Sequence, residues 1–427
     1  MLSVLSMENF VGYVQPWLPD FVVRWIVWLY LAYQLRRLNG LDHPMKELRT
    51  VKRIKRQGGE VEKENKFSRV AERTEAANEQ HYEVPTDFFV GHLGPCRKYS
   101  SCEWGPIRGE LADEKSGGGK LPSTLAEAET YTFDSYLSKM RIDEVPADGS
   151  GRVLEIGCGW GSFLLYAASK YPALNFVGFS NSSTQIAHIL SEADNRGLKN
   201  VSALRLDIND FCDAQLRPEH IFGPTNLRVS PMKSRADSTD LGLSPSKISP
   251  AKNIRGRKNG LVANGGTSHN FLFDRLFSCE CLEHSKDYER AFKAMSEVLK
   301  DDGKVFVQIL CHREYTYFMN NDDWMGRNFF TGGTIPSTKL FMFFTKHLVV
   351  DDTWYIRGSE YSKTLDAWLN NLHKNRLALK NIFRENGYAS PSYELEKWRM
   401  FYIMSSVSFG FNKGKEWMVA YFTFSKR

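Results

Sequence analysis

The stretch Arg152-Val-Leu-Glu-Ile-Gly-Cys-Gly-Trp-Gly-Ser-Phe163 decides how this chain folds. Its first five residues form an apolar run that predicts a short buried strand, and a helical pattern starts at Ser162. Between them, glycines at alternate positions let the backbone turn sharply and lie against a ligand without an intervening Cβ. A strand, a glycine turn and a helix form the first half of a nucleotide-binding crossover unit.

The spacing of Gly157, Gly159 and Gly161 narrows the choice of ligand. The dinucleotide fingerprint is G-x-G-x-x-G, whereas here the third glycine comes one residue early. No Lys-Ser or Lys-Thr pair follows, which excludes a P-loop. S-adenosylmethionine remains, because it has no phosphates and its amino-acid tail can lie along the glycines. The alternative is a glycine-rich turn that only packs a helix on a sheet.

Strand and helix patterns alternate on both sides of this turn. Such alternation predicts an α/β fold with a mostly parallel sheet covered on both faces. The expected strands are Arg152–Ile156, Asn175–Phe179, Val201–Leu206, Phe273–Cys279 and Lys304–Ile309.

A segment at about 213–270 interrupts the alternation of strand and helix patterns. It is rich in Ser, Pro, Gly and basic residues and too poor in large apolar residues to form a core, so we expect a disordered insertion. Ser230, Ser244 and Ser249 each start a Ser-Pro-x-Lys sequence, which resembles a proline-directed kinase site. Phosphorylation there would weaken contact with an anionic surface. Chance recurrence in a biased segment is the alternative.

Residues 1–74 predict an apolar helix followed by a charged linker. The apolar run Phe21–Tyr33 is interrupted by Arg24 and is shorter than the roughly 20 residues of a membrane span. Residues 18–37 therefore predict one of two arrangements. One is a peripheral helix at a membrane surface, with Trp25, Trp28 and Tyr30 at the headgroup level. The other is a helix that packs on the domain or on a partner.

Composition sets wider limits on function. The chain has 427 residues, 42% of them hydrophobic, which suits one large or two ordinary domains. A net charge of +6 is mild and does not indicate nucleic-acid binding. Seven scattered cysteines, without a CxxC or a metal-type pairing with histidine, indicate reduced thiols and no metal site. Together with a start that lacks a standard secretory signal, they predict a cytoplasmic protein.

Motifs along the chain resemble the cyclopropane-fatty-acid synthase superfamily of S-adenosylmethionine-dependent methyltransferases, and within it the coclaurine N-methyltransferase-like proteins. The resemblance starts near Glu75 and omits the insertion. It implies a Rossmann-like class I methyltransferase at 75–427, with a seven-stranded sheet, a helical N-terminal extension and an aromatic-rich C-terminal cap. The matching motifs lie at 80–89, 98–102, 124–129, 153–163, 180–185, 283–284, 329–337 and 412–420.

The resemblance implies S-adenosylmethionine as cofactor and a set of residues that bind it. Tyr99 and Ser100 would fold over the cofactor, and Glu155 would take its ammonium. The three glycines would form the turn. The amides of Asn181 and Gln185 would grip the ribose, and Asp207 and Ile208 would meet the adenine. Ordinary structural roles are the alternatives, such as Asn181 capping a helix. The set is Tyr99, Ser100, Glu155, Gly157, Gly159, Gly161, Asn181, Thr184, Gln185, Asp207 and Ile208.

The expected chemical centre is the turn after the fourth strand, where ligands sit in open parallel sheets. The resemblance implies that Glu280 lines the cleft and that Glu283 and His284 orient and deprotonate an amine. An ammonium has no lone pair, so its methylation needs a base within hydrogen-bond reach. A histidine that titrates near neutral pH suits this task. A surface Glu-His pair at a helix start is the alternative.

Two departures from the cyclopropane synthases bear on the acceptor. Those enzymes use a bicarbonate ion as base and carry histidine and cysteine where this chain has Gln308 and Ser101. We therefore expect methyl transfer to the nitrogen of a small aromatic amine. The plant amine enzymes commonly carry the same histidine, so Gln308 also indicates a divergent substrate. The alternative is a cyclopropane-fatty-acyl-phospholipid synthase or lipid C-methyltransferase acting on unsaturated acyl chains. A cofactor-binding scaffold without activity is a third possibility.

Overall fold

The computed structural model describes residues 15–39, 49–55, 70–71, 84–107, 121–213, 271–319 and 323–427. The predicted disordered insertion lies outside these residues from position 214 onward, and so do Ser230, Ser244 and Ser249. Most of the predicted charged linker also lies outside them.

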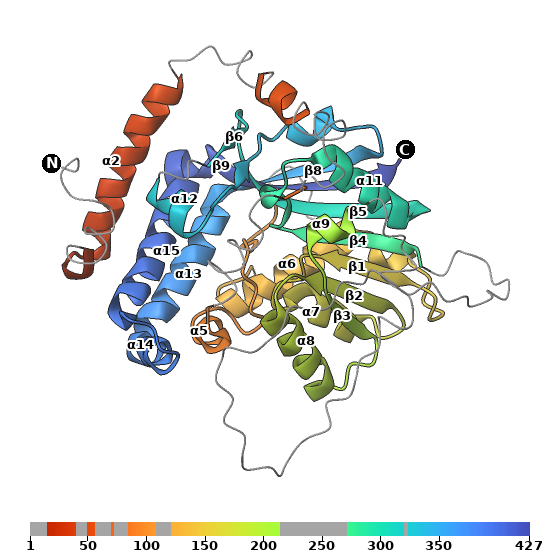
Figure 1. The fold of residues 1–427 in the computed structure, drawn as a ribbon, viewed down its shortest axis with the longest axis horizontal. Coiled ribbons are helices and arrows are strands. Elements are labelled where there is room, and N and C mark those ends of the chain that lie inside the picture. Colours follow the sequence, from red (N-terminus) through yellow and green to blue (C-terminus); the bar gives the residue numbers. More distant parts are fainter. Residues whose placement is uncertain are drawn as a thin grey trace, which may run out of the picture.

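A single seven-stranded sheet forms the centre of the described chain, with the strand order β3-β2-β1-β4-β5-β9-β8 (Figure 1). The five strands β1 to β5 pair in parallel, whereas β9 runs antiparallel to both β5 and β8. The prediction of a mostly parallel, seven-stranded α/β sheet is confirmed. The strands are β1 Arg152–Ile156, β2 Asn175–Ser180, β3 Val201–Arg205, β4 Phe273–Cys279, β5 Leu299–His312, β8 Leu348–Arg357 and β9 Trp417–Lys426.

The five expected strands all form, and the largest difference is at β5. This strand begins five residues before Lys304 and ends three residues after Ile309. It is longer because it pairs with β4 on one side and with β9 along Lys304–His312 on the other. The aromatic-rich C-terminal part is only partly a cap, because ten of its residues, Trp417–Lys426, form β9 inside the sheet.

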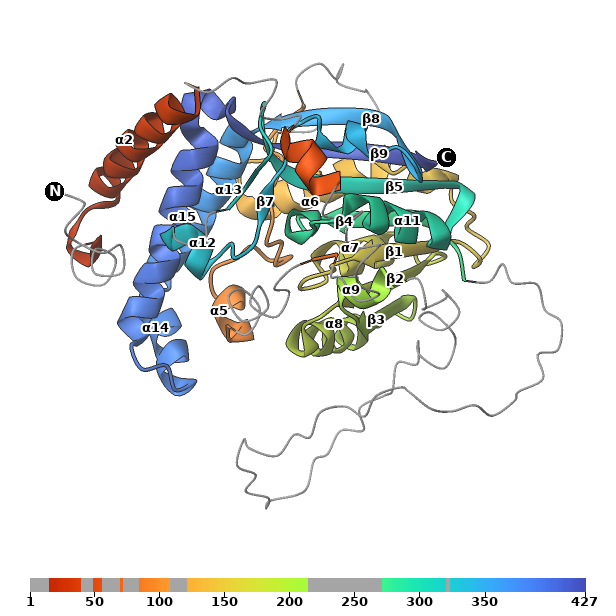
Figure 2. The same cartoon turned by 45° about the horizontal axis from the view of Figure 1, so that its top comes forward.

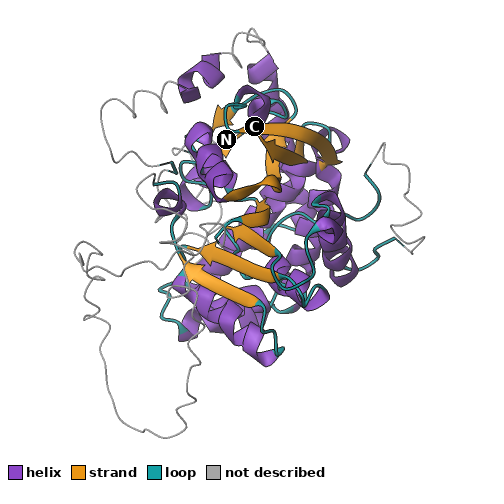
Figure 3. Ribbon diagram, turned by 90° about the vertical axis from the view of Figure 1, so that its right-hand side faces the viewer, coloured by secondary structure: helices purple, strands orange, loops and turns teal. Residues whose placement is uncertain are grey.

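Alternate residues of the central strands point to opposite faces, as strand geometry requires. Figure 3 shows helices on both sides of the sheet. One core contains Val153, Phe277 and Phe306, and the other contains the neighbouring Leu154, Leu276 and Val305. The helices that follow the strands are α7 Ser162–Lys170, α8 Ser183–Asn195, α9 Ile208–Phe211 and α11 Tyr288–Val298.

The helix before the first strand is α6, Leu125–Lys139. Thr124 and Glu127 close a capping box at its start, which satisfies backbone N–H groups that the helix cannot pair. Its buried Phe133 and Tyr136 pack onto the sheet. Smaller elements are η2 Gln15–Trp17, η3 Ile142–Glu144, η4 Leu282–His284, β6 Tyr317–Phe318, α12 Trp324–Asn328, β7 Thr334–Ile335 and η5 Leu340–Phe343.

A helical layer stands beside the sheet, and in it the N-terminal helix α2, Asp20–Asn39, packs against the helices that precede β9. The layer consists of α5 Thr86–Val90, α13 Gly358–Lys374, α14 Arg376–Glu385 and α15 Pro391–Gly414, with α2 outermost (Figures 1 and 2). The buried Trp398 of α15 contacts rings of α5, including Phe88 and Phe89. No helix in the parts that the structure describes is long and apolar enough to cross a membrane.

Gly161 offers a test of the turn that decides the fold. Its φ is +73°, and a Cβ there would lie 2.6 Å from Cγ1 of Ile189 on α8. Gly197 has a similar φ of +68° but no neighbouring atom within 4 Å of an added Cβ. We expect Gly197→Ala to lower the free energy of unfolding by about 1–2 kcal/mol through backbone strain alone. Gly161→Ala should cost about 1–3 kcal/mol more through overpacking.

Urea unfolding of the two variants beside the wild type measures this difference. Equal losses in the two variants would contradict the packing role that we assign to Gly161.

Candidate active site

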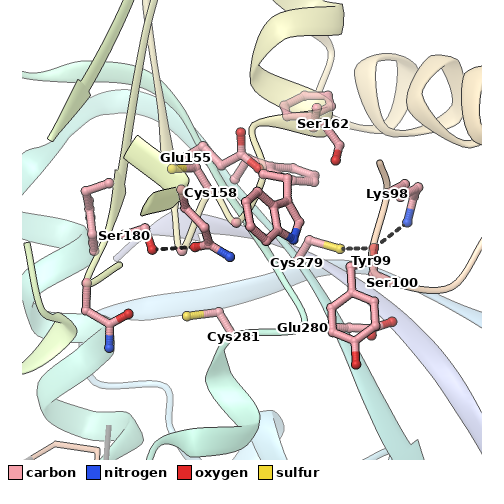
Figure 4. Close-up of a pocket in the computed structure, with 18 of the residues that line it drawn as sticks. Lys98, Tyr99, Ser100, Glu155, Cys158, Ser162, Ser180, Cys279, Glu280 and Cys281 are labelled. Atoms are coloured by element: carbon pink, nitrogen blue, oxygen red, sulfur yellow. Dashed lines mark hydrogen bonds between the residues drawn. The ribbon is translucent and has the colours of Figure 1, made fainter. Parts of the chain in front are cut away.

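A pocket opens where the parallel strands β1, β2 and β4 end. Loop residues 97–100 form its opposite wall, and Figure 4 shows Tyr99 and Ser100 facing Ser180 and Cys281 across it. Most of the predicted site residues line this one pocket. They are Tyr99, Ser100, Glu155, Gly157, Gly159, Asn181, Gln185, Asp207, Ile208, Glu280 and His284.

Three predicted site residues, Gly161, Thr184 and Glu283, are not in this lining. Gly161 precedes α7 and packs against α8. The Thr184 hydroxyl lies 2.8 Å from the hydroxyl of Ser182, which is the N-cap of α8. Ser182, rather than Asn181, therefore caps this helix, which leaves Asn181 at the pocket.

The glycine turn brings backbone close to the pocket. Gly157 and Gly159 have φ values of +72° and +50°, which other residues adopt only with strain. A Cβ on Gly157 would lie 2.6 Å from the sulfur of Cys281, whereas a Cβ on Gly159 would enter open space. The missing side chain of Gly159 thus leaves room on the pocket wall where a ligand can lie against the backbone.

Two buried polar groups on the pocket wall match what S-adenosylmethionine offers. Oε2 of Glu155 and Nε2 of Gln185 have no hydrogen-bond partner within the described parts of the chain. The Gln185 amide is oriented by its Oε1, which accepts the hydroxyl of Ser180 at 2.7 Å. Leaving such groups unpaired costs about 1–3 kcal/mol each, and an ammonium and a ribose hydroxyl would satisfy them. The residues therefore fit this cofactor.

Glu280 connects three distant segments at the pocket. It follows β4 with a φ of +47°, and its half-buried side chain faces the loop at 94–104. Its Oε1 accepts the backbone N–H of Ser101 at 3.0 Å and Nε2 of Gln308 at 2.7 Å. Its Oε2 accepts the hydroxyl of Tyr361 at 2.8 Å. Burial raises the pKa of Glu280, although Lys98 and these hydrogen bonds oppose the rise.

Buried side chains behind the pocket hold this arrangement in place. The hydroxyl of Tyr136 donates to Oε1 of Gln308, so both ends of that amide are occupied. Lys98 donates its ammonium to the Ser100 hydroxyl at 2.5 Å and to the Ser101 carbonyl at 2.6 Å. Its charge also lies 5.3 Å from the ring centre of Tyr136.

Sequence reasoning did not assign functional roles to Tyr136, Lys98 or Tyr361. Lys98 opens the motif at 98–102, and Tyr361 belongs to the aromatic-rich C-terminal part that the sequence predicts to cap the site, but no spacing connects either residue to Glu280.

The loop at 94–104 is held by side-chain acceptors on several elements. Glu129 of α6 accepts the N–H groups of Cys96 at 2.9 Å and Lys98 at 3.2 Å. Arg97 lies between them with a φ of +55°, which aims both N–H groups at one carboxylate. Three further backbone N–H groups of the loop donate to Thr364, Thr132 and Glu360.

Glu283 and His284 lie on η4 but face different surroundings. His284 lines the pocket, with its ring centre 5.5 Å from that of Phe330. Glu283 is buried, and its Oε1 accepts the backbone N–H of Leu310 at 3.0 Å. Burial, and then the nearby charge of Glu280, raises the pKa of Glu283 to about 8. Glu283 is therefore mostly protonated at neutral pH.

Three cysteine thiols also line the pocket, namely Cys158, Cys279 and Cys281. Burial raises the pKa of Cys279 and Cys281 to about 12 and that of Cys158 well above its usual range. All seven cysteines of the chain are free thiols.

Asp207 also lines the pocket and is the N-cap of α9. Its Oδ1 accepts the backbone N–H of Asn209 at 2.8 Å.

Comparisons with known proteins identify a family and several relatives of this chain. Residues 70–221 and 266–410 match the model of the family described as mycolic acid cyclopropane synthetase. The chain is 27% identical over 353 residues to (S)-coclaurine N-methyltransferase of Papaver somniferum, covering 81% of this chain and 79% of that protein. It is 23% identical over 292 residues to cyclopropane-fatty-acyl-phospholipid synthase of Escherichia coli K12, covering 68% and 54%.

Solved structures share the fold. A coclaurine N-methyltransferase bound to N-methylheliamine and SAH superposes with a TM-score of 0.71 at 22% identity, covering 99% of this chain and 100% of that one. A cyclopropane synthase from Mycobacterium tuberculosis gives a TM-score of 0.54 at 18% identity, covering 84% and 99%.

The raised pKa of Glu283 predicts a pH dependence of stability. Between about pH 4.5 and pH 8, the folded chain keeps a proton on this residue that the unfolded chain releases. The free energy of unfolding should therefore fall as pH rises through this window, by at most about 1.4 kcal/mol per pH unit from this group.

Glu283→Gln cannot release that proton, so its stability should fall less steeply over the same window. Urea unfolding at several pH values measures both slopes. Parallel slopes for wild type and variant would show that Glu283 does not titrate as this burial implies.

Proposed function

Because the chain belongs to the mycolic acid cyclopropane synthetase family and is an S-adenosylmethionine-dependent methyltransferase, we propose that it methylates the nitrogen of a small aromatic amine. The observation that carries this proposal is the placement of His284 and Glu280 on the wall of one pocket. Relatives named as N-methyltransferases support it, since six of them match over 81–84% of this chain.

The cofactor would occupy the part of the pocket built by the glycine turn. Glu155 would take its ammonium, Asn181 and Gln185 its ribose, and Asp207 with Ile208 its adenine. When bound, S-adenosylmethionine would supply a methyl group on a sulfonium. The lone pair of a neutral amine would attack that methyl carbon in line, so that the N–C bond forms as the C–S bond breaks and S-adenosylhomocysteine leaves. No covalent bond to the protein is needed, so positioning is the main catalytic device.

His284 is the base that we assign to the reaction. Both oxygens of Glu280 already accept hydrogen bonds, and Glu283 holds its own proton near neutral pH. His284 is the only histidine among the described residues that line the pocket. Its imidazole would take the proton of the bound ammonium, which frees the lone pair for methylation.

Glu280 would position the acceptor. Its carboxylate is fixed from three directions, so it can attract a cationic amine without moving. Aromatic rings line the pocket itself, among them Tyr99, Trp160 and Phe179. Such rings favour an aromatic acceptor, because its own ring can stack against them.

The lipid alternative receives less support from these residues. The Gln308 amide bonds both Glu280 and Tyr136, and a glutamine carries no charge that would hold an anion. At this position the chain therefore lacks the histidine that the cyclopropane synthases carry beside their bicarbonate base.

We also propose that residues 75–427 form the methyltransferase domain, after an extension at 1–74. The seven free thiols support a cytoplasmic location.

An acceptor screen tests the proposed reaction. Purified full-length protein is incubated with methyl-labelled S-adenosylmethionine, a panel of aromatic amines, and vesicles of unsaturated phospholipid. We expect label on the nitrogen of one or more amines. Label that enters acyl chains while every amine stays unlabelled would overturn the N-methyltransferase proposal.

A variant at His284 tests the assignment of the base. His284→Ala should lower turnover at neutral pH by about 10²-fold or more, because the bound amine keeps its proton. Raising the pH should recover part of the loss, since a larger fraction of the amine is then already neutral. Glu283→Gln, which mimics the protonated form, should lose far less activity.

Calorimetric titration with S-adenosylmethionine provides the control, because removing the base should leave cofactor binding nearly intact. Unchanged turnover in His284→Ala, or a loss of the same size at every pH, would refute the assignment.

A further inference from the structure

Helix α2 directs its charges inward. Among its side chains from Asp20 to Tyr33, only Asp20 and Arg24 are charged. Asp20 accepts Nε of Arg399 at 2.9 Å and lies 3.0 Å from Nε2 of His373. Although burial raises its pKa, these partners lower the pKa of Asp20 to about 2.

Arg24 makes the second attachment. It donates to Asp366 at 2.6 Å and to the Ser406 hydroxyl at 3.0 Å. Val23, which lies between these two attachments, and Val27, which follows Arg24 by three residues, are buried against the protein. The inner face of α2 is therefore a mixed polar and apolar seam that fixes the helix against α13 and α15.

The opposite face of α2 is aromatic and exposed. Soluble proteins usually show the reverse pattern, with apolar residues inside and charges outside. The spacing of three or four residues places these side chains in one stripe along the helix. We call this stripe the outer face of α2, and it consists of Phe21 (72% exposed), Trp25 (62%), Trp28 (48%), Leu29 (43%) and Tyr33 (60%).

The exposed aromatic surface continues beyond the helix itself. Trp17 of η2, just before α2, is 85% exposed. Tyr30 is 43% exposed but comes from the flank of the helix rather than from the stripe. A contiguous apolar patch of this kind marks an interaction site on a soluble domain.

We propose that the outer face of α2 binds the surface of a lipid bilayer, with the helix lying in the interfacial plane. Tryptophan and tyrosine are the residues that prefer the headgroup region, because each has an apolar ring and a polar atom. Arg36 and Arg37 follow in the sequence, and the chain has a net charge of +6, which suits anionic headgroups. The proposal is independent of which acceptor is methylated.

The shape of the surface favours a bilayer over a second protein. Figures 1 and 2 show α2 at the outer edge of the molecule, beyond α15, so this helix forms a projecting ridge, and the exposed side chains of its outer face lie along it. A deformable bilayer accepts a ridge without a matching groove, whereas two copies of this chain would have to meet ridge against ridge. The inward charges help as well, because no charged side chain of the described outer face would enter the apolar layer.

Vesicle co-sedimentation of the full-length protein tests this proposal. Vesicles of phosphatidylcholine are compared with vesicles that also contain phosphatidylserine, at low and high salt, without cofactor or acceptor. We expect the wild type to sediment with both, more strongly with phosphatidylserine at low salt. The double variant Trp25→Ser/Trp28→Ser should bind at least about tenfold more weakly, because two interfacial rings are lost.

Leu377→Ser provides the matched control, since Leu377 of α14 is 79% exposed on another element. It should bind like the wild type, and thermal unfolding should show all variants to be folded. Wild type that stays in the supernatant with both vesicle types, or equal binding by the double variant, would overturn the proposal. So would a dimer that the double variant abolishes in analytical ultracentrifugation without any vesicle binding. None of these outcomes depends on methyl transfer.

Discussion

The carboxylate of Glu280 is the constraint on which the site depends. Three donors reach it from the loop at 94–104, from β5 and from α13, so one half-buried side chain fixes the relative positions of three segments. Removing it would leave buried donors unpaired in all three segments at once, which is more costly than losing a single contact. The pocket is thus shaped by a polar junction in its wall.

The opposite wall of the pocket depends on a similar device. The loop at 94–104 is not a strand of the sheet, and five of its N–H groups donate to side chains of α6 and α13 instead. Such bonds can be made by an irregular backbone, including Arg97 in the left-handed region. A loop fixed in this way can follow the outline of a ligand while remaining ordered.

Patterns of neighbouring residues in the sequence predicted those strands and turns that depend only on apolar runs and backbone freedom. The strands β1 to β4 and the glycine turn follow from apolar runs and from backbone freedom at Gly157, and most of the predicted binding residues line one pocket. The limits of β5 and the strand β9 depend on partners far along the chain. Likewise, Tyr136 and Tyr361 bond residues more than 80 positions away, a distance that no spacing reveals. The protonated state of Glu283 follows from burial, which the sequence Leu-Glu-His does not show.

The thiols in the pocket wall have a consequence for chemical selectivity. A methyl sulfonium reacts with sulfur nucleophiles, and an ionised thiol would compete with the intended acceptor. With a pKa of about 12, only about one in 10⁵ of the Cys279 and Cys281 thiols is ionised at neutral pH. Burial therefore protects the enzyme from methylating itself, and it allows three cysteines to stand beside an alkylating agent without being consumed.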